Sequence, residues 1–195
     1  MKIKTHNFFN IGVLTYVGAF FVIPPYSLIS AILITSPANR IIDKYGHKNK
    51  EVEIERKFGP FRIKKKIVIP VRTNEMHSPL SALFWGFIPA SIIFIIIYFL
   101  RNYYSFTSFP LIPYFILIQG LLSGELHLLL DLPTEGGIFI NKKRFSMGHF
   151  AYDNPLLNFS GVIIGLFLTY ISFGGTYEKA YHVARHIIFI FKHIA

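Results

Sequence analysis

The segment GLLSGELHLLLDLPTEGG places a histidine and a carboxylate four residues apart at the end of a long apolar run. These are His127 and Asp131, and on a helix their Cβ atoms would lie about 5–6 Å apart, so both could reach one metal ion. Gly120 and Gly124 fall on the same face, and small residues at that spacing let neighbouring helices approach closely. We therefore predict that this face points into a helix bundle, whereas Glu125 lies about 200° away around the helix. The alternative is a histidine that an aspartate holds by a hydrogen bond, without a metal.

The composition indicates a membrane protein. Hydrophobic residues make up 52% of the 195 residues and charged residues only 15%, whereas soluble domains carry about 25% charged residues. Residues 79–100 hold no charge over 22 positions, which is long enough to cross a hydrocarbon layer of about 30 Å. We therefore predict an all-α integral membrane protein with about five transmembrane or membrane-embedded helices.

Prolines and changes in charge divide the chain into the elements that must position these residues. Pro24-Pro25 interrupts an apolar stretch that is too long for one span, and predicts a hairpin of two helices. Ser78-Pro79 is typical of a helix start, with serine as the N-cap and proline at the first helical position. The five predicted helices cover about residues 6–23, 26–45, 79–101, 111–131 and 155–174.

Two segments outside these helices have other patterns. Residues 48–72 alternate between apolar and charged side chains around the turn signal Gly59-Pro60, which predicts a small cytoplasmic β-hairpin. Residues 178–195 are basic and amphipathic, which predicts a C-terminal helix on the membrane surface. We therefore expect one helical membrane domain over residues 1–177, with the β-hairpin as an insertion, followed by the amphipathic tail.

The net charge of +10 is concentrated in loops. Residues 37–78 hold 11 Lys and Arg residues and residues 132–157 hold three, whereas the connector at 101–113 holds only Arg101. The positive-inside rule therefore predicts a multi-pass protein with its N-terminus and both basic loops in the cytoplasm. The same charge would suit nucleic acid, but basic loops that orient the chain and meet anionic lipid explain it more simply.

This topology gathers polar residues from the ends of several helices at one depth. His6 opens the first helix, His77 precedes the third, and His127 and Asp131 close the fourth. The chain has no cysteine, so any metal must be bound by His, Asp, Glu or Asn, and a His/carboxylate cluster suits it. The other polar residues expected at this depth are Asn39, Asp43, His47, Asp153, Asn154 and Asn158.

Some of these positions have simpler alternatives. His6 could be only an interfacial residue. Asn39 and Asp43 could cap their helix or pair with Arg40 or Lys44.

Five short motifs carry a family resemblance. They are THNFF, NRIIDKYGH, RTNEMHS, HLLLDLPTEGG and YDN, in this order over about residues 5–158. With them the chain resembles the LexA-regulated, membrane-bound metal-dependent hydrolase family, and is more similar still to its archaeal relatives of unknown function. NRIIDKYGH has one aspartate where the bacterial branch has Asp-x-Asp-His, and Arg72-Thr73-Asn74 stands where that branch has His-Arg-Gly.

We therefore expect a membrane-embedded hydrolase with a divalent metal ion, zinc or manganese, at the cytoplasmic interface. The metal would lower the pKa of bound water and stabilise charge on a phosphoryl or carbonyl oxygen. Asp43 would be a ligand or general base, and Arg72 would hold a substrate phosphate bidentately.

A site at headgroup depth suggests membrane lipid as the partner, with a lipid or lipid-linked phosphoester as substrate. The alternatives are a non-enzymatic membrane protein whose cluster only joins helices, and a membrane-tethered nucleic-acid-binding protein. The expected metal residues are His6, His47, His77, His127 and Asp131.

Overall fold

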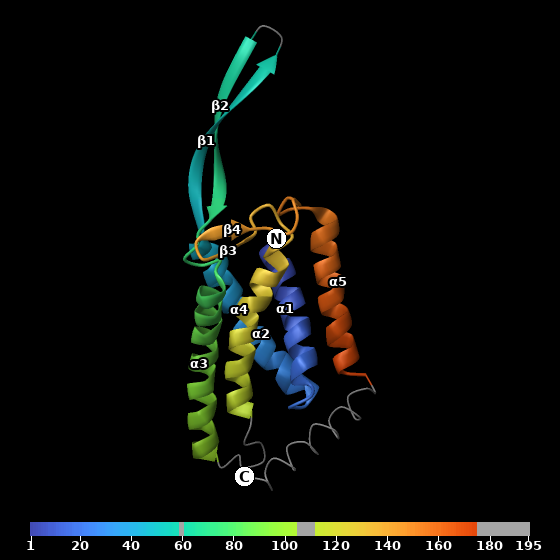
Figure 1. Cartoon of the computed structure of the whole chain (residues 1–195). Coiled ribbons are helices and arrows are strands. Elements are labelled where there is room, and N and C mark those ends of the chain that lie inside the picture. The colour runs from blue at the N-terminus through green and yellow to red at the C-terminus, as the bar shows by residue number, and fades with distance from the viewer. Residues whose placement is uncertain (59–60, 105–111, 175–195) are drawn as a thin grey trace.

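The computed structural model of the chain describes residues 1–58, 61–104 and 112–174. Within these residues five helices form one bundle, and a long two-stranded ribbon projects from one end of it (Figure 1). The predicted tail helix at 178–195 lies outside the described residues. The helices are α1 (Ile3–Gly18), α2 (Pro24–Gly46), α3 (Pro79–Tyr104), α4 (Ile112–Asp131) and α5 (Pro155–Ser172).

Three of these helices are long and apolar enough to cross a membrane: α3 over Pro79–Leu100, α4 over Tyr114–Asp131, and the whole of α5. α1 is 16 residues long, and α2 carries three charged residues in its last two turns. Of the five predicted membrane helices, three therefore qualify as spans by length and composition.

The two adjacent prolines reverse the chain between α1 and α2, as predicted. Ile23 is extended, with φ −61° and ψ 142°, which is the conformation favoured before a proline, and Pro24 and Pro25 begin α2. α1 ends at Gly18, five residues earlier than predicted, because residues 19–23 form the turn. The reversal brings the start of α1 and the end of α2 to the same end of the bundle (Figure 1).

α3 and α4 pack closely through small residues. A Cβ atom added to Gly86 would overlap the carbonyl oxygen of Gly120, and one added to Gly124 would overlap the backbone of α3. α4 therefore turns its glycine face toward α3 and into the bundle, as predicted. His127 and Asp131, which continue this face, have no exposed area.

This close approach gives a stability prediction. Gly124→Ala should lower the melting temperature in detergent, because the new methyl group would collide with the Ala82 carbonyl group and push α3 away. Overpacking of this kind typically costs about 1–3 kcal/mol of unfolding free energy. Gly174→Ala is the matched control, because the nearest atom to its added Cβ lies at an ordinary 3.6 Å. Equal melting temperatures for the two variants would contradict the close packing of α3 and α4.

The start of α1 is fastened to the start of α5. The Thr5 hydroxyl and the Lys2 backbone N–H both donate to the side-chain oxygen of Asn158, at 2.7 and 3.0 Å. The Asn158 amide in turn donates to the carbonyl groups of Tyr152 and Asn154. Asn158 therefore fixes the first turn of α1, which carries His6, relative to α5.

The predicted β-hairpin is confirmed. β1 (His47–Phe58) follows α2 without a break and pairs antiparallel with β2 (Phe61–Arg72). The register runs from His47 opposite Arg72 at the base to Phe58 opposite Phe61 at the far end. Two of the predicted site residues, His47 and Arg72, therefore face each other where the ribbon joins the bundle.

The second polar loop contains a small hairpin that we did not predict. β3 (Ile138–Ile140) pairs with β4 (Lys143–Phe145), and the two turn residues between them, Asn141 and Lys142, both have positive φ values. Such a two-residue turn matches the twist of an antiparallel pair. The Phe139 N–H donates to the His77 carbonyl group at 2.8 Å, so both polar loops lie at the same end of the bundle (Figure 1).

Candidate metal centre

Three of the expected metal residues, His6, His77 and His127, converge on a fourth, the carboxylate of Asp131. The Asp131 side chain lies with its Oδ1 atom 3.2 Å from His6 Nε2. Its Oδ2 atom lies 3.4 Å from His127 Nε2 and 3.7 Å from His77 Nε2. All four side chains have no exposed area, although they come from α1, from the residues before α3, and from α4. The hairpin of α1 and α2 thus brings His6 to the far end of α4.

The titratable residues form two adjacent groups that could hold a metal ion. In the first group, His6, His127 and Asp131 offer ligand atoms that all lie within 4.8 Å of one another, and in the second group Asp43, His47 and His77 do the same. The groups touch, because His127 Nε2 lies 3.5 Å from Asp43 Oδ1. The first group is fully buried, whereas in the second group Asp43 and His47 are half-buried and only His77 is fully buried.

Backbone and side-chain acceptors fix the tautomers of two of the histidines. His127 Nδ1 lies 3.0 Å from the side-chain oxygen of Asn39, and His47 Nδ1 lies 2.7 Å from the Asp43 carbonyl oxygen. Since both oxygens can only accept, each Nδ1 carries a hydrogen, and in the neutral form of each ring the lone pair is on Nε2. For His127 that lone pair faces Asp43 and Asp131, which is the arrangement of a metal ligand with an outer hydrogen-bond partner.

Asn39 is itself held in place by other asparagines. Its amide group donates to the side-chain oxygen of Asn7 at 2.9 Å, which leaves its own oxygen facing His127. Asn10 donates to that same oxygen at 3.2 Å and to the Ser123 carbonyl group at 3.0 Å. Asn39 is fully buried, so it neither caps α2 nor pairs with a surface cation, which were the simpler alternatives for this position. Asn10 had no role in the sequence predictions, although its i+4 spacing from His6 places both on one face of α1.

The H-x-x-x-D-x-x-T-x-x-G motif forms a cradle for Arg72. One guanidinium nitrogen of Arg72 donates to Asp131 Oδ1 at 2.5 Å. The other donates to the Thr134 hydroxyl and to the Gly137 carbonyl oxygen, both at 2.9 Å. Gly137 has a φ of +56°, and a Cβ atom at Gly136 would overlap the guanidinium, so both glycines are required here.

This cradle gives Arg72 a further role. Its two terminal nitrogens donate to protein acceptors, so the residue orients Asp131. The bidentate phosphate contact that we predicted for its guanidinium stays a prediction. The Met1 nitrogen also donates to Asp131 Oδ1, at 2.9 Å, so this oxygen is satisfied while Oδ2 is left to the histidines.

Several buried polar atoms of the cluster have no hydrogen-bond partner among the described residues. They are both ring nitrogens of His6 and His77, His127 Nε2, and Asp131 Oδ2. A buried polar atom without a hydrogen-bond partner typically lowers the unfolding free energy by about 1–3 kcal/mol, so six such atoms close together would destabilise the fold strongly. A cation among these atoms would satisfy several of them at once, and their donor set of imidazole nitrogens and a carboxylate suits a divalent metal.

His77 is neutral at physiological pH. Burial lowers its pKa from 6.5 to about 2, against the opposing attraction of Asp131. A neutral imidazole is the form that binds a metal. Gly46 packs directly against this ring, since a Cβ atom there would overlap it, so the end of α2 fixes the position of His77.

Two other carboxylates that the sequence singled out lie apart from the centre. Asp153 is exposed in the loop before α5. Glu125 is half-buried on α4, and its Oε1 atom has no hydrogen-bond partner among the described residues. The separation of Glu125 from the cluster agrees with its predicted place on another face of α4.

A search of curated proteins and a search of solved structures found no match. One family model matches, and it covers residues 1–130 of this chain. The matched segment contains every predicted site residue except Asp131, which follows it directly. The model is described as a protein of unknown function, and because it covers more than half of the sequence, the chain belongs to this family, DUF1286.

Proposed function

We propose that the protein is a metal-dependent hydrolase of the membrane interface, related to the LexA-regulated membrane-bound hydrolases. One observation carries the proposal: Asp131 Oδ2 lies 3.4 Å from His127 Nε2 and 3.7 Å from His77 Nε2, and these three buried atoms have no hydrogen-bond partner among the described residues. Such a set of side chains suits a divalent metal ion. Because the set contains no thiolate, zinc or manganese fits best.

The residues around this set support hydrolytic chemistry. A bound metal would supply an activated water and stabilise charge on a phosphoryl or carbonyl oxygen. Asp43 lies 3.5 Å from His127 Nε2 and is half-buried, so it can accept a proton from a water at the edge of the centre. Arg72 and Asn39 orient Asp131 and His127 through hydrogen bonds.

The position of the centre supports an interfacial substrate. α4 ends at Asp131 and α5 begins at Pro155, so the cluster lies where two of the candidate spans end. We propose that this end faces the cytoplasm in a multi-pass protein, because the loops gathered there carry most of the Lys and Arg residues. A lipid or lipid-linked phosphoester would reach the centre at this depth.

A purely structural role is the second candidate. Asp131 already forms ion pairs with Arg72 and with the Met1 nitrogen, and these could join α1, β2 and α4 without a metal. The structural role leaves the histidine nitrogens unsatisfied, which is the reason that we favour the metal.

Elemental analysis of the detergent-purified protein tests the proposal. The parent protein should hold zinc or manganese, and His127→Ala should lose at least 90% of it, because the variant lacks a buried candidate ligand that also lies 3.5 Å from Asp43. The control is His149→Ala, since His149 is exposed in the loop before α5. The parent should also hydrolyse a chromogenic phosphoester in a chelator-sensitive way. A stable parent that is free of metal and inactive after zinc or manganese is added would refute the proposal.

A further inference from the structure

A cleft of about 1020 Å³ opens beside the candidate metal centre. Its walls come from the start of α1, the end of α2, the end of β2 and the loop that follows α4. Asp43 and His47 of the second metal group line it, and so does Arg72. A molecule in this cleft would therefore lie against the half-buried side of the centre.

The cleft is strongly basic. Two carboxylates, Asp43 and Glu135, line it together with six cationic side chains. Within the described part of the chain, only one of the six, Arg72, has a carboxylate partner. The six are Lys2, Lys4, Arg40, Lys44, Arg72 and Arg144.

We propose that this cleft binds a polyanionic phosphate group, either a phosphomonoester or a diphosphate, and holds it against Asp43 and His47. Five cations that have no carboxylate partner among the described residues surround one space, and they raise the local concentration of anions there. They are matched better by a group of two or three negative charges than by a phosphodiester, which carries one. The inference rests on the proposed function for its assignment of this group as substrate, whereas binding itself depends only on the cleft.

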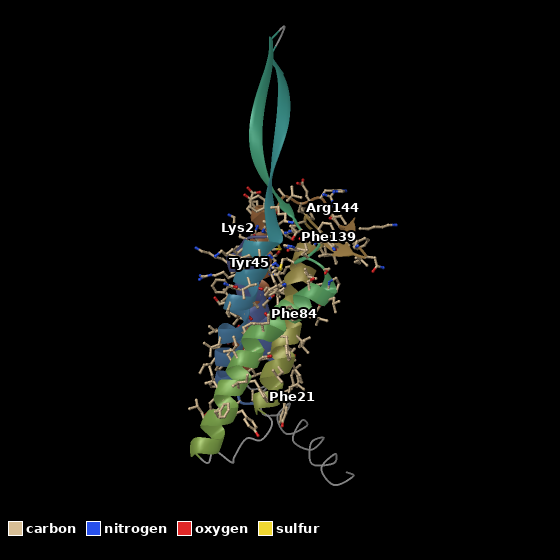
Figure 2. All side chains as sticks on the ribbon, turned by 90° about the vertical axis from the view of Figure 1, so that its left-hand side faces the viewer. Lys2, Phe21, Tyr45, Phe84, Phe139 and Arg144 are labelled. Carbon is tan, nitrogen blue, oxygen red and sulfur yellow. The ribbon has the colours of Figure 1, made fainter. Side chains whose placement is uncertain are left out.

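The same cleft has apolar walls that suit an amphiphile. Ile3, Val71, Phe139 and Tyr152 also line it, and Val71 and Tyr152 are 41% and 60% exposed. Figure 2 shows Phe139 and Arg144 close together at the end of the bundle from which the ribbon projects, and Lys2 at the same level. A phosphate can reach this place as a lipid headgroup or in a soluble molecule, and the two sources differ in what the apolar walls contribute.

Titration calorimetry of the detergent-solubilised full chain tests the proposal with three probes. They are inorganic diphosphate, short-chain phosphatidic acid, and the matching phosphatidylcholine, whose phosphate is a diester beside a choline cation. The first two should bind, and the choline lipid at least tenfold more weakly. Phosphatidic acid that binds more tightly than diphosphate identifies a lipid source, and the reverse order identifies a soluble one.

The variant Arg40→Glu/Lys44→Glu reverses two exposed cations of the cleft and should weaken both anionic probes at least tenfold. Lys142→Glu/Lys143→Glu makes the same change of charge at the β3–β4 turn, outside the cleft, and should bind like the parent. The proposal is wrong if neither anionic probe binds the parent, or if the two double variants bind the anionic probes with the same affinity. Metal content measured on the same samples separates the two proposals. A parent that is metal-free and stays inactive after zinc or manganese is added, but whose cleft still binds phosphate, supports this inference and refutes the hydrolase proposal.

Discussion

Asp131→Asn should abolish metal binding and metal-dependent activity while the helical bundle stays assembled in the membrane. Asp131 is the only carboxylate of the fully buried group, and its Oδ2 atom lies between His77 and His127 without a hydrogen-bond partner among the described residues. Asparagine keeps the size and one oxygen for Arg72, but it replaces the anionic oxygen with a neutral group. Loss of a ligand or of its supporting carboxylate commonly costs about 10–100-fold or more in metal affinity.

Thermal melting with and without a chelator separates the metal centre from a structural cluster. A ligand that binds only the folded state at 100 times its dissociation constant adds about 2.7 kcal/mol to stability. For a metal centre, the chelator should therefore lower the melting temperature of the parent and leave that of Asp131→Asn unchanged. For a structural cluster, the variant should melt lower than the parent by the same amount in both conditions, because Arg72 loses its carboxylate partner.

The matched control for this experiment is Asp153→Asn. Asp153 is an exposed aspartate in the loop directly before α5, so its variant should keep the metal and the chelator response of the parent. Equal melting of the parent and Asp131→Asn, each indifferent to the chelator, would refute the metal hypothesis. Insertion in the membrane should survive in every case, because an uncharged residue is easier to bury there than a charged one.

The convergence of the site could be predicted because it depends on chain reversals that the sequence marks clearly. Pro24-Pro25 places His6 and Asp43 at one end of the bundle, whatever the exact helix boundaries are. The glycine spacing on α4 indicates its inward face, and therefore the direction of His127. Topology and face together were enough to place the predicted ligands near one another.

The hydrogen-bond partners could not be predicted in the same way, because they depend on side-chain positions that only the packed bundle fixes. Arg72 has the chemistry to bind a phosphate, and only the loop after α4, which brings Thr134 and Gly137 beside it, turns it toward Asp131. The β3–β4 hairpin was missed because three-residue strands show too little alternation to detect. For Asn39 the sequence predicted the depth of the site but left capping or pairing with Arg40 or Lys44 as alternatives, and only the packed bundle shows that its side chain is fully buried.

Asn39→Leu should weaken metal binding about 10–100-fold, which is the usual effect of losing an outer hydrogen-bond partner of a metal ligand. Leucine has nearly the same size as asparagine but no acceptor for His127 Nδ1. The His127 ring can then carry its hydrogen on Nε2 and donate it to Asp43 or Asp131, and in that tautomer Nε2 has no lone pair for a metal. The change also leaves the amide of Asn10 with one partner fewer, so some stability should be lost as well.

Three comparisons show whether Asn39 acts through His127 or only through stability. Asn39→Asp keeps an oxygen acceptor for His127 and should restore most of the metal affinity. Gln119→Leu removes a buried amide deeper in the bundle, where it bonds Ser30 and Leu14, and should lower the melting temperature without changing metal affinity. The ¹⁵N chemical shifts of the imidazole in the metal-free protein report the tautomer directly, and they should move in Asn39→Leu alone. If Asn39→Leu and Gln119→Leu lose stability equally and both keep the metal affinity of the parent, Asn39 is a packing residue, and the lone pair of His127 Nε2 does not depend on it.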